Sequence, residues 1–429
     1  MIYQVDGETL TLRKAAASLQ NGDELRINPG VHPALELRGL SGVLVTGAPG
    51  AVLDGGAGTA CMLTDCTGCT LRGLVARGAG RKYENAQGAG FRVTGGRDLV
   101  IEDCETTGFQ RAGVELCGVQ GARVERVCAR DNGYCGILAT WDGAGTVSRD
   151  ITVRDCRALN NAGDPTITHN HSGNGILLDG VQGALVEFCE AAFNGWDMQN
   201  EEFNGPVGIW TAHADRAVIR YCVSHDNRTQ WGKTDGGGFD FDGGTTNSLI
   251  EYCLSFSNDG AGYLLCQYEN APAMYGNEIR LSVSLDDGIG NHRCSLALCD
   301  CGSPARTEGG LVRGCVFYNS HGRDIVQGHL DETVLENCVL LKRGGGQYFR
   351  HEYLESALPH RGADRQTWGE VRFVQNQYHD FDLPDRRTKE PFLSIGSRAP
   401  LTDPRELPAY FTELELERLC GDAQPASQE

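Results

Sequence analysis

The chain has 429 residues, with 38 Lys and Arg against 57 Asp and Glu, and a formal net charge of −19. An acidic chain without a basic cluster is a poor partner for nucleic acid or an anionic membrane. No apolar run approaches the ~20 residues of a membrane span, and the first residues lack the pattern of a signal peptide. We therefore expect a cytoplasmic protein with no nucleic-acid or membrane partner, in which the 18 cysteines are mostly thiols.

The first segment, residues 1–34, is expected to form an N-terminal cap and the first strand. TLRKAAASLQ at 11–20 places its apolar residues on one helical face, which predicts a short helix. A turn, a strand and a Pro-Gly turn follow in GDELRINPGVHP. A helix at this position suits the end of a repeat array, whose core is otherwise exposed.

A degenerate repeat fills residues 35–350. Short alternating runs such as VIEDC and LVEFC end in cysteine, at Cys104, Cys128, Cys156, Cys189, Cys222, Cys253, Cys315 and Cys338. Ser282 takes the cysteine position in the one interval of double length. An Asn usually follows, and then a second short strand such as GILLD at 175–179. Three short strands in each repeat predict three parallel sheets wound into about ten coils.

The last segment, residues 351–429, loses this repeat. We expect it to form an irregular C-terminal cap that reaches back along one flank of the coils, with a helix at 411–420. The final residues, GDAQPASQE, are expected to be disordered.

The I-x-x-C/N register, the N-G and G-I-x-L patterns and GDELRINPG at 22–30 resemble right-handed parallel β-helix proteins of the pectate-lyase-like superfamily. The resemblance covers roughly residues 20–350 and implies an all-β right-handed parallel β-helix with PbH1-type repeats. That superfamily includes lyases, hydrolases, epimerases, esterases and phage tailspikes. The resemblance therefore implies a carbohydrate-active protein without selecting one reaction.

The coils between Cys156 and Cys315 are longer than the others. They reach 33 residues, against 24 in a short coil, through insertions at 164–172, 196–206 and 228–236. Insertions at the same phase of successive coils should stack into a wall beside a cleft. The wall contributes the candidate substrate-binding residues His169, His171, Glu202, Trp231 and Lys233.

Carboxylates gather on the strands beside this wall. Strand alternation directs Asp240 and Asp242 outward and Phe239 and Phe241 inward. We predict Asp235, Asp240 and Asp242 as catalytic residues, and Asp179, Trp210 and His213 as substrate-binding residues. Two carboxylates at i and i+2 lie ~6.5–7 Å apart. Inverting glycoside hydrolases separate theirs by ~6.5–9.5 Å and retaining ones by ~5–5.5 Å.

These residues predict a glycoside hydrolase that acts on an oligosaccharide without a cofactor. Asp235 and Asp242 resemble the arrangement in lacto-N-biosidase-type β-helix hydrolases. KTDGGGFD also resembles the NTDG stretch of polygalacturonases, but their other motifs have no aligned counterparts here. Two alternatives stay open. One is a lyase or uronate epimerase with a Lys or His base and Ca²⁺ held by the aspartates, and the other is a non-catalytic carbohydrate-binding or structural β-helix.

Four cysteines form a weaker candidate metal site. Cys294, Cys299 and Cys301, with Cys266 one coil away, are soft ligands that could gather. Strand alternation is expected to direct some of them inward and others outward, so we predict no metal site there.

Overall fold

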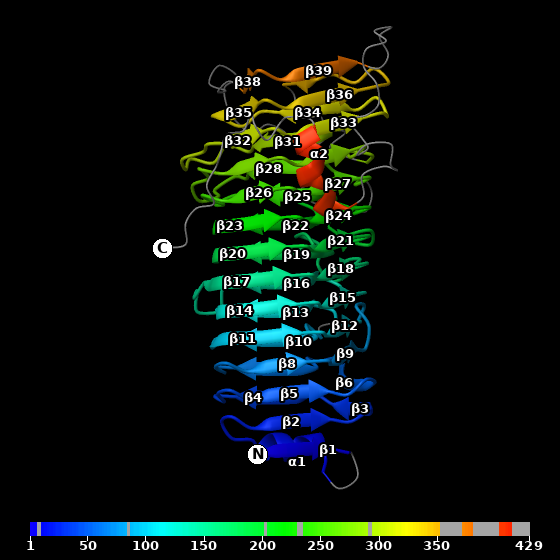
Figure 1. Cartoon of the computed structure of the whole chain (residues 1–429), viewed down its shortest axis with the longest axis vertical. Coiled ribbons are helices and arrows are strands. Elements are labelled where there is room, and N and C mark those ends of the chain that lie inside the picture. The colour runs from blue at the N-terminus through cyan, green and yellow to red at the C-terminus, as the bar shows by residue number, and fades with distance from the viewer. Residues whose placement is uncertain are drawn as a thin grey trace.

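The computed structural model describes residues 1–6, 10–83, 86–200, 204–229, 235–290, 294–351, 371–380 and 403–413. The chain winds into a rod of stacked coils, and each full coil contributes one strand to each of three sheets (Figure 1). Strands of successive coils pair in parallel, as Leu177 of one coil does with Trp210 of the next. The fold is therefore an all-β parallel β-helix, as the sequence predicts.

The three sheets contain 14, 12 and 13 strands, and we name them A, C and B respectively. Sheet A contains β1 (Ile2–Val5), β2 (Glu24–Ile27), β5 (Leu44–Gly47), β8 (Thr70–Arg72), β11 (Arg97–Glu102), β14 (Gln120–Glu125), β17 (Ser148–Arg154), β20 (Val181–Glu187), β23 (Asp215–Arg220), β26 (Leu249–Glu251), β29 (Glu278–Arg280), β32 (Gly310–Arg313), β35 (Thr333–Glu336) and β38 (Arg372–Val374). Sheet C contains β4 (Leu35–Arg38), β7 (Cys61–Thr64), β10 (Phe91–Thr94), β13 (Ala112–Cys117), β16 (Cys135–Thr140), β19 (Asn174–Asp179), β22 (Val207–Ala212), β25 (Gly237–Phe241), β28 (Tyr263–Gln267), β31 (Cys294–Asp300), β34 (Asp324–Gly328) and β37 (Phe349–Arg350). Sheet B contains β3 (Gly30–Pro33), β6 (Ala51–Gly56), β9 (Val75–Gly78), β12 (Glu105–Thr107), β15 (Cys128–Arg130), β18 (Arg157–Leu159), β21 (Glu190–Ala192), β24 (Val223–His225), β27 (Leu254–Phe256), β30 (Val283–Leu285), β33 (Val316–Asn319), β36 (Val339–Lys342) and β39 (Gln377–Asp380). Sheets A and B include strands from 1–34 and 371–380, whereas all 12 strands of sheet C lie within 35–350, so the coils slightly exceed the ten or so predicted.

The cysteines that end the repeated runs form a column in the core. Each thiol donates a hydrogen bond to a carbonyl of the preceding coil, as Cys189 does to Val153 (Sγ to O, 3.5 Å). Ser282 occupies the same position, and its hydroxyl accepts the Cys253 amide at 3.1 Å. Cys128 ends one of the repeated runs but does not belong to this column. It begins β15 opposite Glu105, so the preceding Val127 takes the position. Both residues are apolar, and the pattern did not separate them.

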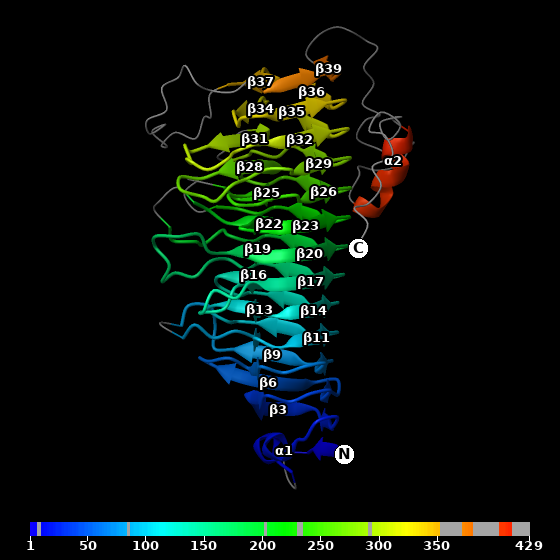
Figure 2. The ribbon, with the colours of Figure 1, turned by 90° about the vertical axis from the view of Figure 1, so that its left-hand side faces the viewer.

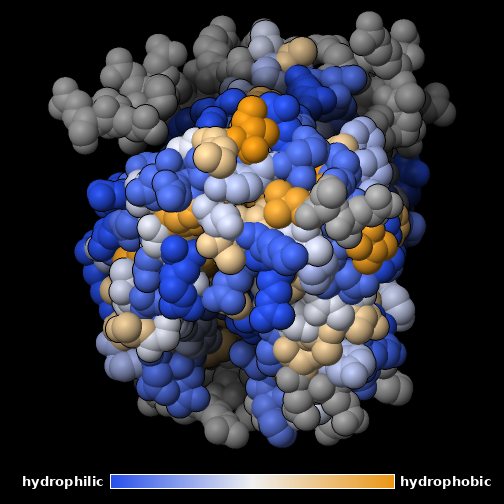
Figure 3. Space-filling model, turned by 90° about the horizontal axis from the view of Figure 1, so that it is seen from below, coloured by the Kyte–Doolittle hydropathy of each residue, from blue (hydrophilic) through white to orange (hydrophobic). Residues whose placement is uncertain are grey.

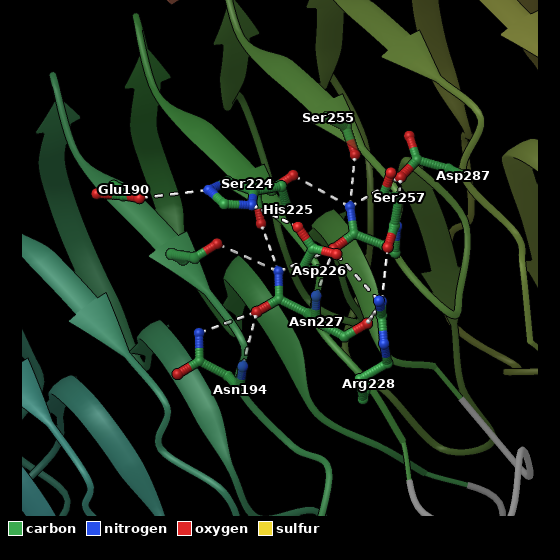
Figure 4. A network of polar contacts seen from close by, with 12 residues as sticks. Glu190, Asn194, Ser224, His225, Asp226, Asn227, Arg228, Ser255, Ser257 and Asp287 are labelled. Atoms are coloured by element: carbon green, nitrogen blue, oxygen red, sulfur yellow. Dashed lines mark hydrogen bonds and ion pairs between the residues drawn. The ribbon is translucent and has the colours of Figure 1, made fainter. Parts of the chain in front are cut away.

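A second column consists of buried asparagines. Each side-chain amide donates to the asparagine of the next coil, with N–O distances of 2.9–3.0 Å through Asn132, Asn161, Asn194, Asn227 and Asn258. Figure 4 shows one such contact, from Asn194 to Asn227, and the last asparagine of the column donates to Asp287 at 2.8 Å. The sequence shows the recurring asparagines but not that they bond to one another. Each interior amide is donor and acceptor, which satisfies polar groups the core would otherwise leave unpaired.

Helices lie at one end and along one flank of the rod. Helix α1 (Leu12–Ser18) buries Leu12 and Ala15 at the N-terminal end, whose outer surface is mainly hydrophilic (Figure 3). A 3₁₀ turn (Pro404–Glu406) leads into α2 (Leu407–Glu413). Helix α2 lies along one flank of the rod (Figure 2), and its Tyr410 and Phe411 pack against residues of sheet B. Neither α-helix in the described part of the chain has the length or apolarity needed to cross a bilayer.

Candidate active site on sheet C

The inserted loops stack beside β19, β22 and β25, on the side of the rod where loops project in Figure 2. Asn204 donates its side-chain amide to Asn170 of the preceding loop (N–O 2.7 Å). The backbone amide of Gly205 donates to the Asp235 carboxylate of the following loop (2.6 Å). The described parts of these loops therefore form the predicted wall. Three candidate residues, Glu202, Trp231 and Lys233, lie outside the described residues.

Strand register aligns the predicted carboxylates on the outer face of sheet C. Asp179 of β19 pairs with Ala212 of β22. The amide of Asp242 donates to Thr211 (2.8 Å), which places Asp242 directly after β25 and opposite Ala212. Asp179, Ala212 and Asp242 thus occupy one outward row on three successive strands. Phe239 and Phe241 are fully buried on the inner side, as predicted.

The predicted catalytic aspartates lie in different environments. Asp240 is only 3 % exposed, and one of its carboxyl oxygens is buried without a hydrogen-bond partner. Burial, with the nearby charges of Asp242 and Asp235, raises the pKa of Asp240 well above its usual range. Asp242 is partly exposed, and burial raises its pKa to about 7. Asp235 lies two residues before β25 and has φ +54°. Its carboxylate accepts a hydrogen bond from the amide of Gly205.

His213 links the aspartate row to two aromatic residues that the sequence analysis did not identify. Its Nδ1 lies 2.8 Å from a carboxyl oxygen of Asp179, and its Nε2 lies 2.6 Å from the Tyr268 hydroxyl. The bond to Asp179 raises the pKa of His213. The Trp141 ring meets His213 edge to face at 5.4 Å between centroids, and Trp141 is 38 % exposed. Trp141 follows GILAT as His213 follows GIWTA, so aligning these repeats would have identified it.

Two predicted substrate-binding residues, Trp210 and His171, contact each other beside the wall. Trp210 is 4 % exposed and donates its indole N–H to Asn174 (3.2 Å), so it has no ring face free for a sugar. His171 lies between Tyr134 and Trp210, at centroid distances of 5.5 and 4.9 Å. Burial lowers the pKa of His171 to about 4. His169 is exposed on the 164–172 loop. The expectation for Trp210 is corrected, because the wall covers the strand face beneath it. His171 lies in the wall itself and is partly exposed, so its role in substrate binding stays a prediction.

Three thiols lie next to Asp242. Cys266 of β28 pairs directly with Cys299 of β31, and Cys301 follows at i+2 on the same side. The Sγ atoms of these three residues all lie within 4.8 Å of one another. Cys294 is not in this group. Alternation was expected to separate these cysteines, but an i, i+2 pair on one strand and its partner on the next strand share a face.

A separate groove of 510 Å³ lies on sheet B, between the strands and the turn that precedes α2. Phe188, Tyr221, His225 and Arg405 are among the residues that line it. The rings of Phe188 and Tyr221 stack at 5.2 Å between centroids. None of the predicted site residues in the described ranges lines this groove.

Comparison with known proteins establishes the handedness of the fold. A family model described as a right-handed beta helix region matches residues 50–166. GH136 lacto-N-biosidase from Eubacterium ramulus has a similar structure (TM-score 0.55, 16% identity, 88% of this chain, 67% of that chain). So does the catalytic unit of a GH87 alpha-1,3-glucanase from Streptomyces thermodiastaticus (0.54, 13%, 86%, 64%). The A-module of a mannuronan C-5 epimerase from Azotobacter vinelandii is also similar (0.52, 12%, 85%, 89%). No curated protein matches the sequence. The fold is a right-handed parallel β-helix.

Proposed function

We propose that the protein is a glycoside hydrolase that cleaves an oligosaccharide between Asp179 and Asp242. The observation that carries the proposal is their outward row, in which Ala212 lies between the two carboxylates. Neighbouring strands are ~4.8 Å apart, so residues two strands apart are separated by about 10 Å. This spacing lies just above the ~6.5–9.5 Å of an inverting pair, and the small Ala212 side chain leaves room for a side-chain rotation that brings the carboxyl groups into that range.

The reaction needs one proton donor and one proton acceptor. One carboxylic acid protonates the glycosidic oxygen as the bond to the anomeric carbon breaks. The other carboxylate removes a proton from the water that attacks this carbon, and the anomeric configuration inverts. His213 positions Asp179 through their 2.8 Å contact, and the exposed Trp141 offers a ring face to a sugar.

The other two predicted catalytic aspartates receive supporting roles. Asp240 is too deeply buried to touch a sugar. Its raised pKa favours the neutral carboxyl, which places no negative charge beside Asp242. The Asp235 carboxylate accepts a hydrogen bond from the Gly205 amide, which joins two neighbouring loops of the wall. The fold supports only the general class of activity, since two proteins with a similar structure are named as a lacto-N-biosidase and a glucanase.

The test is release of reducing ends from a panel of neutral and acidic oligosaccharides. D179N and D242N should each lower turnover by ~10²–10⁴, the usual contribution of a general acid or base. D65N is the matched control, because Asp65 is exposed at the same edge of sheet C, next to β7. Azide should restore turnover only in the alanine variant of the base, and it should give a glycosyl azide. Full turnover in the D179N/D242N double variant would overturn the proposal.

One observation favours a second candidate, an acidic-sugar lyase or epimerase. The Tyr268 hydroxyl and His213 are 2.6 Å apart, which suits a pair that removes and returns a proton beside a carboxylate. A lyase would give products with a new carbon–carbon double bond, and an epimerase would incorporate deuterium from D₂O without cleavage. A hydrolase gives neither result. Sugar binding without any product would favour the non-catalytic alternative instead.

A further inference from the structure

The group formed by Cys266, Cys299 and Cys301 has the shape of a metal site. The Sγ atoms of Cys299 and Cys301 are 3.5 Å apart, and all three Sγ atoms lie within 4.8 Å of one another. A tetrahedral zinc ion with Zn–S bonds of about 2.3 Å separates its sulfurs by about 3.8 Å. The distances between the sulfurs are therefore already close to those of a zinc site. Rotation about the side-chain bonds can remove the remaining difference.

The backbone fixes this arrangement before any ion binds. Strand pairing sets Cys266 opposite Cys299, and the amide of Cys301 donates to Gln267 (2.9 Å). Asp300 accepts the amide of Gly302 (2.8 Å), in a turn that holds Cys301 beside the other two. A preorganised ligand set needs little ordering when the ion binds.

These thiols differ from those of the core column. Core thiols such as Cys189 and Cys222 are buried in a line along the rod and donate to backbone carbonyls. The three thiols beside Asp242 form a triangle instead, on the outer face, where Cys266 and Cys301 are partly exposed. An ion can therefore reach them. Phe241 pairs with Leu265, so Asp242 follows at the position opposite Cys266, and its carboxylate offers an oxygen ligand on that side.

We propose that Cys266, Cys299 and Cys301 bind one zinc ion as thiolates, with an oxygen ligand in the fourth position. Each thiol releases its proton to solvent as its Zn–S bond forms, and no oxidation or reduction takes place. The ion lies at the edge of the row that contains Asp242. Zinc binding does not depend on the proposed hydrolysis, because it is measured without a sugar.

The first experiment titrates the reduced, chelator-stripped full chain with Zn²⁺ against a chromophoric chelator, and with Co²⁺ by absorption spectroscopy. We expect one ion per chain and an intense sulfur-to-cobalt charge-transfer band. C266S, C299S and C301S should each weaken zinc binding at least tenfold, which corresponds to about 1.4 kcal/mol. C117S is the matched control, since Cys117 is partly exposed in the same outward row of sheet C. No zinc binding by the wild type, or equal weakening by C117S, would overturn the proposal.

The second experiment needs no variant and therefore avoids variants that fail to fold. Zinc should protect the three thiols from alkylation in the wild-type protein, as mapped by mass spectrometry. Cys117 and Cys128, which are also partly exposed, should react equally with and without zinc. Equal alkylation of Cys266, Cys299 and Cys301 in both conditions would overturn the proposal.

Discussion

The buried carboxyl of Asp287 should make the protein less stable as pH rises. Asp287 ends the asparagine column, is 1 % exposed, and accepts from Asn258 and Ser284. Burial raises its pKa to about 7, against about 3.9 in an unfolded chain. Between these values the folded chain keeps a proton that the unfolded chain has lost. Its stabilising contribution is therefore complete below the lower pKa and is lost as pH rises through the upper one.

The size of this effect follows from the two pKa values. Each unit of difference corresponds to about 1.4 kcal/mol, so from about pH 5 to about pH 8 the free energy of unfolding falls by about 2.5 kcal/mol. D287N keeps an acceptor for Asn258 but has no group that ionises. The stability of D287N relative to the wild type should therefore increase by about 2.5 kcal/mol over this range.

Urea unfolding of the wild type, D287N and D142N at both pH values measures this difference. The control replaces Asp142, whose pKa is lowered by hydrogen bonds from the Thr146 and Ala144 amides. Asp142 stays ionised across this range in both states, so D142N should change stability equally at the two pH values. The reasoning is refuted if the wild type and D287N lose the same stability between the two pH values.

Three further predictions test other parts of the structure. G180A should lower turnover, because a Cβ atom there would lie 1.9 Å from the Trp141 ring, whereas G183A, also at positive φ, should not. N227A removes the acceptor for Asn194 and the donor to Asn258, and should lower the free energy of unfolding by about 2–4 kcal/mol in urea titrations; a loss below about 0.5 kcal/mol would contradict the column's role. D179N should lower the pKa of His213 in an NMR titration, because Asp179 raises it, and an unchanged value would contradict their contact.

The coil architecture was predictable because every coil repeats the same chemistry. Strand alternation predicts which side chains near Asp242 point inward and which point outward. Because successive strands of sheet C pair in one register, the same assignment applies along the sheet. Cys128 shows the limit of this method, since two adjacent apolar residues leave the register ambiguous by one. Only contacts between coils can settle such a choice.

The composition of the site was less predictable, because its contacts join segments far apart in the sequence. Alternation directs Asp240 and Trp210 outward, but both residues are buried. Tyr268 reaches His213 from 55 residues away, and no local spacing signals that contact. Alternation along single strands does not reveal the three-thiol group, because it is the register between β28 and β31 that sets Cys266 opposite Cys299.

A crystal structure of the D242N protein with a bound oligosaccharide would test the central claim most directly. We predict that the glycosidic oxygen lies between residue 242 and Asp179, with a sugar ring against Trp141. An oligosaccharide bound in the groove that Phe188 and Tyr221 line on sheet B, with none on the outer face of sheet C, would contradict the proposed active site.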